Sequence, residues 1–482
     1  MSKSKSTHSH VKPPNILVYT EKKEAESILK QVIQYQLSSF LSTNHISDQI
    51  ERAVQADSFV IYPVTVDTLL ASASSWRDNT QLVVLESRLE ASLVTSVQEY
   101  LERGGKIWDL SDNSQLYHEE NYFDSSGQRE LQDQEIATVL RDKFNITVKS
   151  EEEEEIRYTA GFLFGDTETF LERKSGLVKQ RTMTLDLQSP PSQTDPSQTY
   201  LPVRSGGECQ QFDQELYLST LRTVRLGRVL LYVPVLSSTM AVLDGVSLWD
   251  GMAVIAERQT AGEGRGGNRW LSPPGCSMFS LQTFLSADSY LGRRPSLLQH
   301  LVTLASVEAV RSQDGRQDLD VRIKWPNDIY YGKQLKLGGV IAKSSFFGNQ
   351  LSVTIGAGIN LDNSLPTNCL NNIIRSQGQK VLILKQEVLV AETFNRLEHL
   401  ISECNGGNVS GVLELYYKYW LHQNQRVKIT TEQRTEEREV TVIGIDEFGF
   451  LQVKDDEENM FSVTCDGNSF DMMEGLIKPK CN

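Results

Sequence analysis

Residues 257–270 read Glu257-Arg-Gln-Thr-Ala-Gly-Glu-Gly-Arg-Gly-Gly-Asn-Arg-Trp270, and this stretch decides between two fold classes. Its Gly-x-Gly-x-x-Gly spacing from residue 262 matches the dinucleotide-binding fingerprint, which requires a strand before the glycines and a helix that opens at their end. Residues 253–256 predict the strand, but residues 268–275 contain two prolines and a glycine and cannot open a helix. The sequence therefore excludes a Rossmann nucleotide site. A Walker A loop is excluded too, because no Gly-Lys-Ser/Thr ends the run.

The same loop has the composition of a phosphate-binding segment. Glycines at 262, 264, 266 and 267 remove the Cβ atoms that would keep backbone N–H groups away from an anion. Arg265 and Arg269 add fixed charge with bidentate donors. Taken alone, such a run is also typical of a flexible surface loop, so further motifs must decide between the two interpretations.

Length and charge limit the classes of protein that fit. A chain of 482 residues exceeds what one hydrophobic core normally supports, so we expect about two to four domains. The net charge of −15 argues against a nucleic-acid partner, because duplex binding needs a positive surface. The longest apolar run, at 229–236, is far shorter than a membrane span, so no membrane partner is expected.

The N-terminus and the cysteines indicate the compartment. Residues 1–10 are polar and lack both the apolar core of a secretory signal and the arginines of a mitochondrial presequence, so residues 1–13 are predicted to be a disordered tail. Six scattered cysteines show no Cys-x-x-Cys pair and no histidine at ligand spacing. This pattern indicates reduced thiols in a cytoplasmic protein rather than disulfides or structural zinc.

The first half of the chain predicts an α/β domain over 14–225. Short apolar strands alternate with a helical pattern over 25–36, and the strands are expected at 16–19, 58–62, 81–85 and 106–110. The run of five glutamates at 151–155 is interpreted as a solvated face, and the proline- and serine-rich stretch 189–198 as a loop or linker. A second domain is therefore predicted to begin at Leu226.

The second half predicts an α+β core over 226–423 and a small β domain over 424–482. Apolar periodicity indicates helices over 294–312 and 385–404, and alternation indicates a strand from 351 that runs to Asn360, which favours helices on one face of a mostly antiparallel sheet. Short strands with turn residues between them are expected at 425–430, 439–443, 450–453 and 460–463. Such a series matches a small SH3-like barrel.

Two further motifs follow the glycine-rich loop. They are Lys324-Trp-Pro-Asn-Asp328 and Lys336-Leu-Gly-Gly339. In the order Gly-Arg-Gly-Gly-Asn, Lys-Trp-Pro-Asn-Asp, Lys-Leu-Gly-Gly, the chain resembles the biotin protein ligases, specifically the long eukaryotic form called holocarboxylase synthetase. The resemblance is specific over about 226–480 and weaker before that.

The resemblance implies a fold and a reaction. The core is expected to be like class II aminoacyl-tRNA synthetases, with a C-terminal SH3-like β-barrel and an N-terminal glutamine-amidotransferase-like domain. The implied reaction forms biotinyl-5′-AMP from biotin and ATP with Mg²⁺, and then transfers biotin to a lysine of the biotin carboxyl carrier domains of biotin-dependent carboxylases. The implied compartment is the cytoplasm, with a mitochondrial pool possible.

Amidotransferase chemistry is excluded on chemical grounds. That reaction needs a nucleophilic cysteine, and no cysteine precedes Cys209. The N-terminal domain is therefore expected to have a regulatory, acceptor-gating or structural role.

The resemblance also assigns site residues. Arg265, Lys336 and Lys324 are expected to carry the catalysis, because adenylation needs cations and donors rather than a nucleophile. The hydroxyl motif around Ser238 and Thr239, together with Gln259, is expected to satisfy the donors and acceptors of the biotin ureido ring. The predicted biotin-binding set is Ser238, Thr239, Gln259, Glu263, Gly264, Arg265 and Lys336.

The nucleotide side is predicted from the remaining motif residues. The predicted ATP- and adenylate-binding set is Gly266, Gly267, Asn268, Arg269, Asn327, Asp328 and Asn360. The oxygen atoms of Asp328 or Asn327 suit Mg²⁺. Trp325 and Pro326 are interpreted as structural, because tryptophan is more often a core residue than a ligand.

Three other functions compete with this assignment. A lipoate or octanoate protein ligase on the related core should lack the Gly-Arg-Gly-Gly-Asn loop and the appended barrel. A catalytically silent scaffold is disfavoured because Arg265, Lys324 and Lys336 are all present. A transcriptional repressor needs a basic winged helix ahead of the core, and the sequence shows none.

Overall fold

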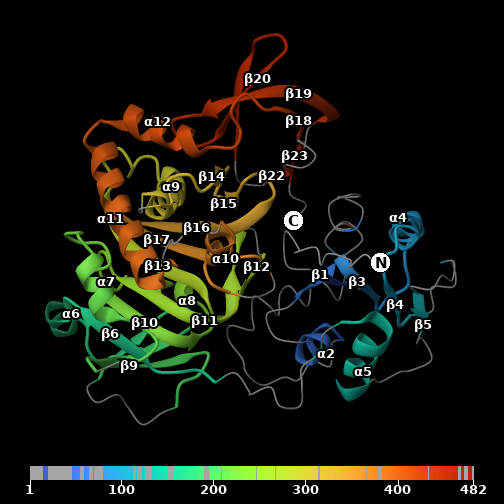
Figure 1. Cartoon of the computed structure of the whole chain (residues 1–482), viewed down its shortest axis with the longest axis horizontal. Coiled ribbons are helices and arrows are strands. Elements are labelled where there is room, and N and C mark those ends of the chain that lie inside the picture. Colours follow the sequence, from blue (N-terminus) through green and yellow to red (C-terminus); the bar gives the residue numbers. More distant parts are fainter. Residues whose placement is uncertain are drawn as a thin grey trace. The chain divides into compact units, whose positions relative to one another are not determined.

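The structure is a computed structural model of the whole chain, and it divides into two compact units (Figure 1). One unit comprises residues 1–155 and the other mainly residues 156–364 and 368–480. The residues that the structure describes are 15–19, 46–54, 59–64, 69, 80–111, 116, 122–124, 133–146, 148, 157–188, 195–207, 209–245, 247–265, 268–312, 315–363, 367–377, 383–431, 434–464, 468–471 and 476–479.

The first unit has a parallel sheet. Its described strands lie in the order β2-β1-β3-β4-β5, and all four neighbouring pairs are parallel. The strand bounds are β1 Asn15–Tyr19, β2 Val60–Val64, β3 Thr80–Leu85, β4 Ile107–Asp109 and β5 Tyr122–Asp124. The four strands expected in this region are thereby confirmed, while the predicted tail at 1–13, the predicted helix at 25–36 and the glutamate run lie outside the described residues.

Helices cover both faces of this parallel sheet. Ile16 and Val18 pack with α2 (Ile46–Ala53) and α5 (Asp133–Phe144), whereas Leu17 and Tyr19 pack with α4 (Ala91–Glu102) on the opposite face. Successive strand residues point to opposite faces, so a strand buried on both sides must be apolar throughout, as β1 is. The described residues of this unit therefore have an α/β arrangement, and its amidotransferase-like assignment stays a prediction.

The described part of the second unit is built on a 12-stranded mixed sheet. Its order is β14-β15-β16-β17-β13-β11-β10-β6-β9-β8-β7, with β12 paired to β11. The pairs β10–β11, β6–β9 and β8–β9 are parallel and the others are antiparallel. The bounds are β6 Gly161–Gly165, β7 Leu177–Lys179, β8 Thr184–Asp186, β9 Tyr200–Ser205, β10 Val229–Leu236, β11 Ala253–Glu263, β12 Arg269–Ser272, β13 Cys276–Ser286, β14 Val321–Lys324, β15 Asp328–Tyr331, β16 Leu335–Phe347 and β17 Gln350–Asn360.

The division between the units lies at 155/156, not at the predicted 225/226. Strand β6 pairs with β10, and Leu163 and Phe170 share one buried core with Val229 and Leu231. Residues 157–225 are therefore part of the core rather than part of the first domain. The proline- and serine-rich stretch suggested a linker, but such a composition also fits a loop within a domain, and only strand pairing distinguishes the two.

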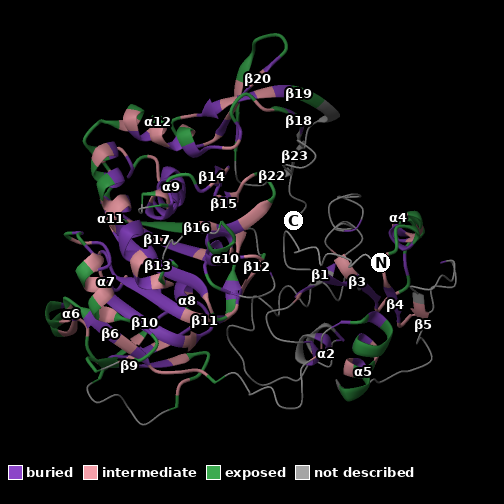
Figure 2. Cartoon of the chain, viewed as in Figure 1, coloured by how far each residue is buried: buried purple, intermediate pink, exposed green. Residues whose placement is uncertain are grey.

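Helices lie on both faces of the large sheet, which corrects the expectation of a single helical face. The long helices α9 (Leu297–Arg311) and α11 (Gln386–Asn405) pack with Ile255 on one side. The short helices α6 (Thr167–Arg173) and α8 (Thr239–Leu243) pack with Val254 and Ala256 on the other. A short helix carries too little apolar periodicity to be seen in the sequence. Figure 2 shows the central strands between these layers as buried.

The C-terminal part of this unit is a six-stranded sheet among the described residues. Its order is β21-β20-β19-β18-β23-β22, antiparallel except for the β18–β23 pair. The bounds are β18 Arg426–Thr431, β19 Arg434–Ile445, β20 Leu451–Asp455, β21 Met460–Val463, β22 Asn468–Asp471 and β23 Leu476–Pro479. Helix α12 (Val409–Tyr419) precedes it, while α7 (Gln214–Thr220) and α10 (Leu370–Ser376) belong to the core. The predicted β domain is confirmed as a sheet, and its SH3-like closure stays a prediction.

No helix among the described residues is long and apolar enough to cross a membrane.

Candidate functional site

The glycine-rich loop joins two paired strands. Gly262 on β11 lies opposite Trp270 on β12, and no helix follows the loop, as the sequence predicted. A Cβ atom at Gly262 would lie 2.4 Å from the backbone oxygen of Trp270, so this glycine is required by the hairpin itself. Within the loop, the N–H of Gly264 donates to the oxygen of Asn268, and Asn268 Nδ2 donates to the oxygen of Arg265. Gly266 and Gly267 lie outside the described residues.

Two glycines of β17 leave bare backbone on the face of the sheet beneath α8. A Cβ at Gly358 would lie 2.5 Å from Nε1 of Trp270, and a Cβ at Gly356 would lie 2.7 Å from Sδ of Met240. Both side chains therefore rest directly on the strand. The indole Nε1 of Trp270 is buried and has no hydrogen-bond partner among the described residues, so it is a donor available to a ligand.

A cluster of charged groups lies beside this strip. Lys336 Nζ is 2.8 Å from Asp328 Oδ1, and Lys324 Nζ is 3.9 Å from Asp328 Oδ2. Lys336 Nζ also lies 5.6 Å from the ring centroid of Trp270. The side chains of all three charged residues are largely shielded from water, and that of Lys336 is the most accessible at 26%. The two predicted catalytic lysines are thus brought together around one carboxylate.

Electrostatics keep this carboxylate ionised. Burial by itself would raise the pKa of Asp328. The charges of Lys336 and Lys324, the hydrogen bond from Lys336 and the charge of Arg265 outweigh burial and hold the pKa below its ordinary value. Arg265, from the glycine-rich loop, therefore acts on the same cluster as the two lysines.

The hydroxyl motif forms a buried polar network with Gln259. The N–H and Oγ1 of Thr239 are 2.7 Å and 3.0 Å from Gln259 Oε1, and Gln259 Nε2 is 3.0 Å from Ser272 Oγ. Ser280 Oγ is 2.8 Å from Thr239 Oγ1. All four residues are buried. Ser238 is also buried, and as the N-cap of α8 it accepts a hydrogen bond from the N–H of Met240.

One backbone group sets the hydrogen-bond directions in this network. The N–H of Thr239 can only donate, so the Gln259 atom that it meets is the carbonyl oxygen, and the hydroxyl of Thr239 must also donate to that oxygen. It follows that Ser280 donates to Thr239 and that Gln259 Nε2 donates to Ser272. Thr239 Oγ1 keeps an acceptor lone pair and Gln259 keeps one N–H. The network can therefore present an acceptor and a donor to a bound group.

The polar network and the charged cluster share one face of the sheet. Ser280 pairs with Gly356, and Gly358, two residues further along the same strand, pairs with Gly339. A Cβ at Gly339 would lie 3.1 Å from Asp328 Oδ1. Ser280 on β13 and Asp328 on β15 are offset by two residues along the strands, about 7 Å, and by three inter-strand steps across the sheet, so a ligand that reaches both must be elongated.

Other predicted residues have structural partners in this arrangement. Glu263 forms an ion pair with Lys343 at 2.8 Å. Asn360 Oδ1 accepts a hydrogen bond from the thiol of Cys276 at 3.4 Å, and Asn327 Nδ2 donates to the backbone oxygen of Val340. Arg269 lies on β12, opposite Glu263. Their predicted ligand contacts stay predictions.

The sequence reading missed Trp270, Ser272 and Ser280 as site residues. Strand pairing places Ser272 opposite Gln259 and Ser280 opposite Gly356, whereas the indole of Trp270, which pairs with Gly262, lies against Gly358. One signal was visible in the sequence, namely Gly356-x-Gly358, because residues two apart on a strand share a face.

The residues named for Mg²⁺ do not form a metal cage. Both oxygens of Asp328 face lysines, and the amide nitrogen of Asn327 is bonded to the backbone. No cluster of three or more His, Cys, Asp or Glu side chains suited to a metal occurs among the described residues. The geometry favours Asp328 as the partner of the two lysines over a role as a metal ligand.

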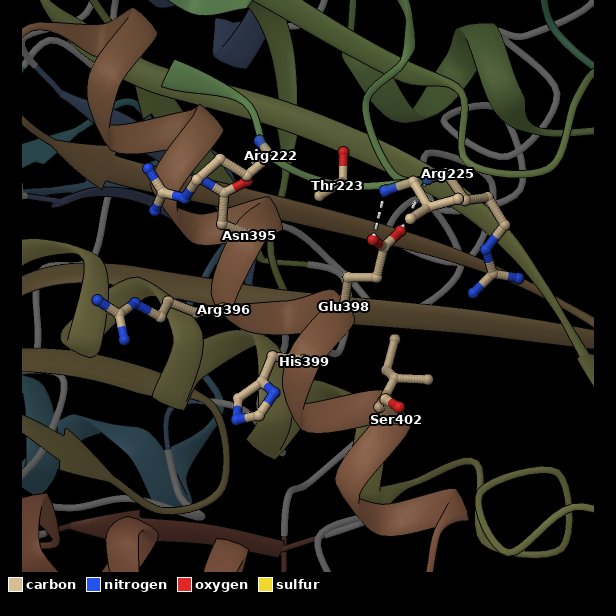
Figure 3. Close-up of a pocket in the computed structure, with 10 residues that line it drawn as sticks. Arg222, Thr223, Arg225, Asn395, Arg396, Glu398, His399 and Ser402 are labelled. Atoms are coloured by element: carbon tan, nitrogen blue, oxygen red, sulfur yellow. Dashed lines mark hydrogen bonds between the residues drawn. The ribbon is translucent and has the colours of Figure 1, made fainter. Parts of the chain in front are cut away.

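A cavity of about 710 Å³ lies elsewhere, on the outer side of α11 (Figure 3). Its lining includes Arg222, Arg225 and Glu398, and none of the predicted site residues. Figure 3 shows the Glu398 carboxylate pointing to the backbone of Arg225, and the carboxylate accepts N–H bonds from residues 224–226. Arg222 and Arg225 are paired with Glu392 and Asp250. The predicted site residues therefore lie around Gly356 and Gly358 of β17 and not in this cavity.

Two family descriptions match the chain. The Biotin/lipoate A/B protein ligase family matches residues 232–360, and the Biotin protein ligase C terminal domain matches residues 422–473. The first span contains every predicted site residue, and the second covers most of the C-terminal sheet.

The similar curated proteins are named as biotin–protein ligases. The chain is 39% identical to the human biotin–protein ligase over 64% of its own length and 43% of the relative's. It is 35% identical to biotin–protein ligase 2 of Arabidopsis thaliana over 56% of its own length and 82% of the relative's. The chain thus spans less than half of the human relative. Among solved structures, a biotin protein ligase from Aquifex aeolicus in complex with biotin and ATP is similar over 48% of this chain and 94% of its own, at 21% identity and a TM-score of 0.39.

Proposed function

Because the chain belongs to the biotin protein ligase family, we propose that it attaches biotin to a lysine of an acceptor protein in an ATP-dependent reaction that passes through biotinyl-5′-AMP. The name of the curated relatives supports biotin as the substrate. The observation that carries the proposal is the placement of the Thr239–Gln259 network and the Lys336–Asp328 cluster on one glycine-lined face.

The polar network is suited to the ureido group of biotin. A cyclic urea has N–H donors and a carbonyl acceptor, and the network presents one acceptor at Thr239 and one donor at Gln259. The dithiolane ring of lipoate and the alkyl chain of octanoate have neither group, and they would leave both protein groups buried and unsatisfied. This polarity favours biotin over the alternative acyl substrates.

The charged cluster is suited to the carboxylate end. In the first step a biotin carboxylate oxygen attacks the α-phosphorus of ATP, and the bond to pyrophosphate breaks. Lys336 would neutralise the attacking carboxylate, while the ionised Asp328 holds the ammonium group in place. Lys324 and Arg265, whose charges also act on Asp328, are proposed to face the phosphates.

The second step needs no protein nucleophile. The ε-amine of the acceptor lysine attacks the acyl carbon of the mixed anhydride, and AMP leaves. Glu263 and the backbone around Gly264 are proposed to line the biotin pocket. Asn268, Arg269, Asn327 and Asn360 are proposed to line the adenylate. Magnesium is proposed to arrive with the phosphates of ATP rather than in a preformed protein cage, because Mg²⁺ is usually held by phosphates, water and one or two carboxylates.

We further propose the biotin carboxyl carrier domains of biotin-dependent carboxylases as acceptors, and the cytoplasm as the compartment. Free thiols at the four cysteines in the described residues support a reducing compartment. A class II synthetase-like core, an SH3-like C-terminal domain and an amidotransferase-like N-terminal domain are proposed as the fold assignments. The parallel sheet covered on both faces supports the last of these.

The test is mass spectrometry of a carrier domain after incubation with the protein, ATP and Mg²⁺. Biotin, lipoate and octanoate are supplied in separate reactions, and a carrier domain with its acceptor lysine changed to arginine is the control. We expect one biotinyl adduct, present only with biotin and ATP and absent from the control. Modification by lipoate at an equal rate would reject the assignment of biotin as substrate.

A further inference from the structure

His422 joins the C-terminal part of the second unit to the turn between Lys324 and Asp328. It lies between α12 and β18, and its side chain is fully buried. Its Nε2 accepts a hydrogen bond from the backbone N–H of Trp325 at 3.0 Å. The residues at the two ends of this turn are Lys324 and Asp328, and Asp328 forms ion pairs with both Lys324 and Lys336.

The segment just before His422 lies alongside β14, as an additional edge strand would. Trp420 forms a parallel bridge with Ile323, and the N–H of Leu421 donates to the oxygen of Ile323 at 3.0 Å. The His422–Trp325 bond is the next contact along this edge, where a side chain replaces the backbone as acceptor. This hydrogen bond to the turn therefore depends on the side chain at position 422.

The hydrogen bond from Trp325 fixes the tautomer of His422, and a second contact is consistent with it. The backbone N–H of Trp325 can only donate, so Nε2 must be unprotonated and Nδ1 must carry the hydrogen. Nδ1 lies 3.0 Å from Oε1 of Gln425, which accepts that hydrogen. Burial, opposed in part by the Gln425 hydrogen bond and assisted by the charge of Lys324, lowers the pKa of His422 to about 4, so the ring is neutral near pH 7.

Trp325 is held on its side chain as well. Its indole Nε1 donates to the backbone oxygen of Gly449 in the turn before β20 at 3.0 Å. Two hydrogen bonds, one to the backbone and one to the side chain of Trp325, thus connect the C-terminal part to this turn. The Lys324 and Asp328 side chains are oriented by the same short segment.

We propose that His422 is a positioning residue for adenylation, because its neutral imidazole holds the 324–328 turn so that Lys324 and Asp328 keep their places beside Lys336. This inference rests on the proposed function for its activity readout. His422 does not touch the substrate, and it acts through the backbone of Trp325.

The first experiment compares two substitutions in the full-length protein. Glutamine can place an oxygen acceptor near the position of Nε2, whereas leucine offers none. We expect H422L to lower the kcat of biotin-dependent ATP–pyrophosphate exchange at least tenfold, and H422Q to recover most of it. The Kd for biotin should change less than twofold, because the Thr239–Gln259 network does not involve the turn.

A matched control separates positioning from stability. Val442 on β19 is fully buried in the C-terminal sheet. Its backbone N–H donates to the backbone oxygen of Gln425, a bond that alanine keeps, and no described hydrogen bond joins Val442 to the turn. V442A should lower the melting temperature while kcat stays within twofold of the wild type. If V442A and H422L had the same melting temperature and lost kcat to the same extent, His422 would have a structural role only.

A third variant tests the tautomer. Glutamate in place of Gln425 would put a carboxylate against Nδ1–H and favour the imidazolium, which cannot accept from Trp325. We expect Q425E to lose exchange activity as the pH falls from 8 to 6, a range in which the wild-type ring stays neutral. An acidic limb identical to that of the wild type would overturn the tautomer argument.

A readout without catalysis keeps the inference separate from the proposed function. Hydrogen–deuterium exchange of the peptide that covers 321–331 should be faster in H422L and unchanged in V442A. Equal exchange in H422L and the wild type would overturn the inference whatever the reaction is. Absence of biotin-dependent exchange in the wild type would overturn the proposed function and leave this measurement to decide the role of His422.

Discussion

Lys336 Nζ and Asp328 Oδ1 lie 2.8 Å apart because β15 and β16 are antiparallel neighbours with Asp328 opposite Gly339. A side chain at Gly339 would crowd this pair, since a Cβ there would lie 3.1 Å from the carboxylate and 3.7 Å from the ammonium. A glycine at position 339 therefore leaves room for the ion pair between Lys336 and Asp328. The lysine belongs to the site because the strand register puts it there, not because of its distance along the chain.

Loss of the Lys336 charge should impair adenylation most. We expect Lys336→Ala to lower biotin-dependent pyrophosphate exchange by about a hundredfold or more, because a contact that strengthens as charge develops is worth roughly 2–4 kcal/mol. Lys333→Ala, at an exposed lysine three residues away, is the matched control and should retain the wild-type rate. Near-normal exchange by Lys336→Ala would remove the residue from the mechanism.

The Thr239 hydroxyl should determine biotin affinity. Thr239→Val keeps the shape of the side chain but removes the acceptor for a ureido N–H, and it removes one donor to Gln259. A lost buried hydrogen bond costs roughly 1–3 kcal/mol, so the Kd for biotin should rise about fivefold to 150-fold. Isothermal titration with biotin measures this change. Thr303→Val, at a fully buried threonine of α9 that bonds its own helix, should leave the Kd unchanged.

Two buried histidines should make the second unit sensitive to acid. Burial lowers the pKa values of His300 and His422 to about 4, below the ordinary value of 6.5. The unfolded chain then binds protons from pH 6.5 downwards while the folded protein does not, so stability is fully present above pH 6.5 and falls between pH 6.5 and 4. At pH 5.5 the loss is about 1.4 kcal/mol per histidine.

The check on this acid sensitivity is a denaturant titration at pH 7.5 and pH 5.5. His422→Gln lacks one of the two titrating groups, so its unfolding free energy should fall by about 1.4 kcal/mol less than that of the wild type over this interval. An equal fall in both proteins would show that His422 is not buried as a neutral ring.

The corrected domain division makes a prediction about truncation. A fragment that starts at 157 keeps β6 and the β7–β9 strands, whereas one that starts at 226 exposes the face of β10 that Leu163 and Phe170 cover. We expect residues 157–482 to fold and to form biotinyl-5′-AMP, and residues 226–482 to be insoluble or to melt at a lower temperature. Circular dichroism and pyrophosphate exchange compare the two. A stable, active 226–482 fragment would contradict the division at 155/156.

The sequence by itself determined the class of each element with strong periodicity. The apolar spacing over 294–312 and 385–404 gave the two long helices, because a helix that covers a sheet must repeat its apolar face every three to four residues. The prolines at 273 and 274 excluded a helix after the glycine-rich loop, and the structure has β12 there. Steric limits on the backbone and apolar periodicity act over a few neighbouring residues, so a single segment is enough to predict whether it forms a helix or a strand.

Only the tertiary structure decided what lies beside what. Trp270 rests on Gly358, and His422 accepts a hydrogen bond from Trp325, although 88 and 97 residues separate these pairs in the chain. The sequence also placed residues 157–225 with the wrong domain, because the pairing of β6 with β10 joins segments about sixty residues apart. Strand pairing and side-chain burial are long-range choices set by the whole core. A motif can therefore name the residues of a site, but the register of the sheet decides which of them meet.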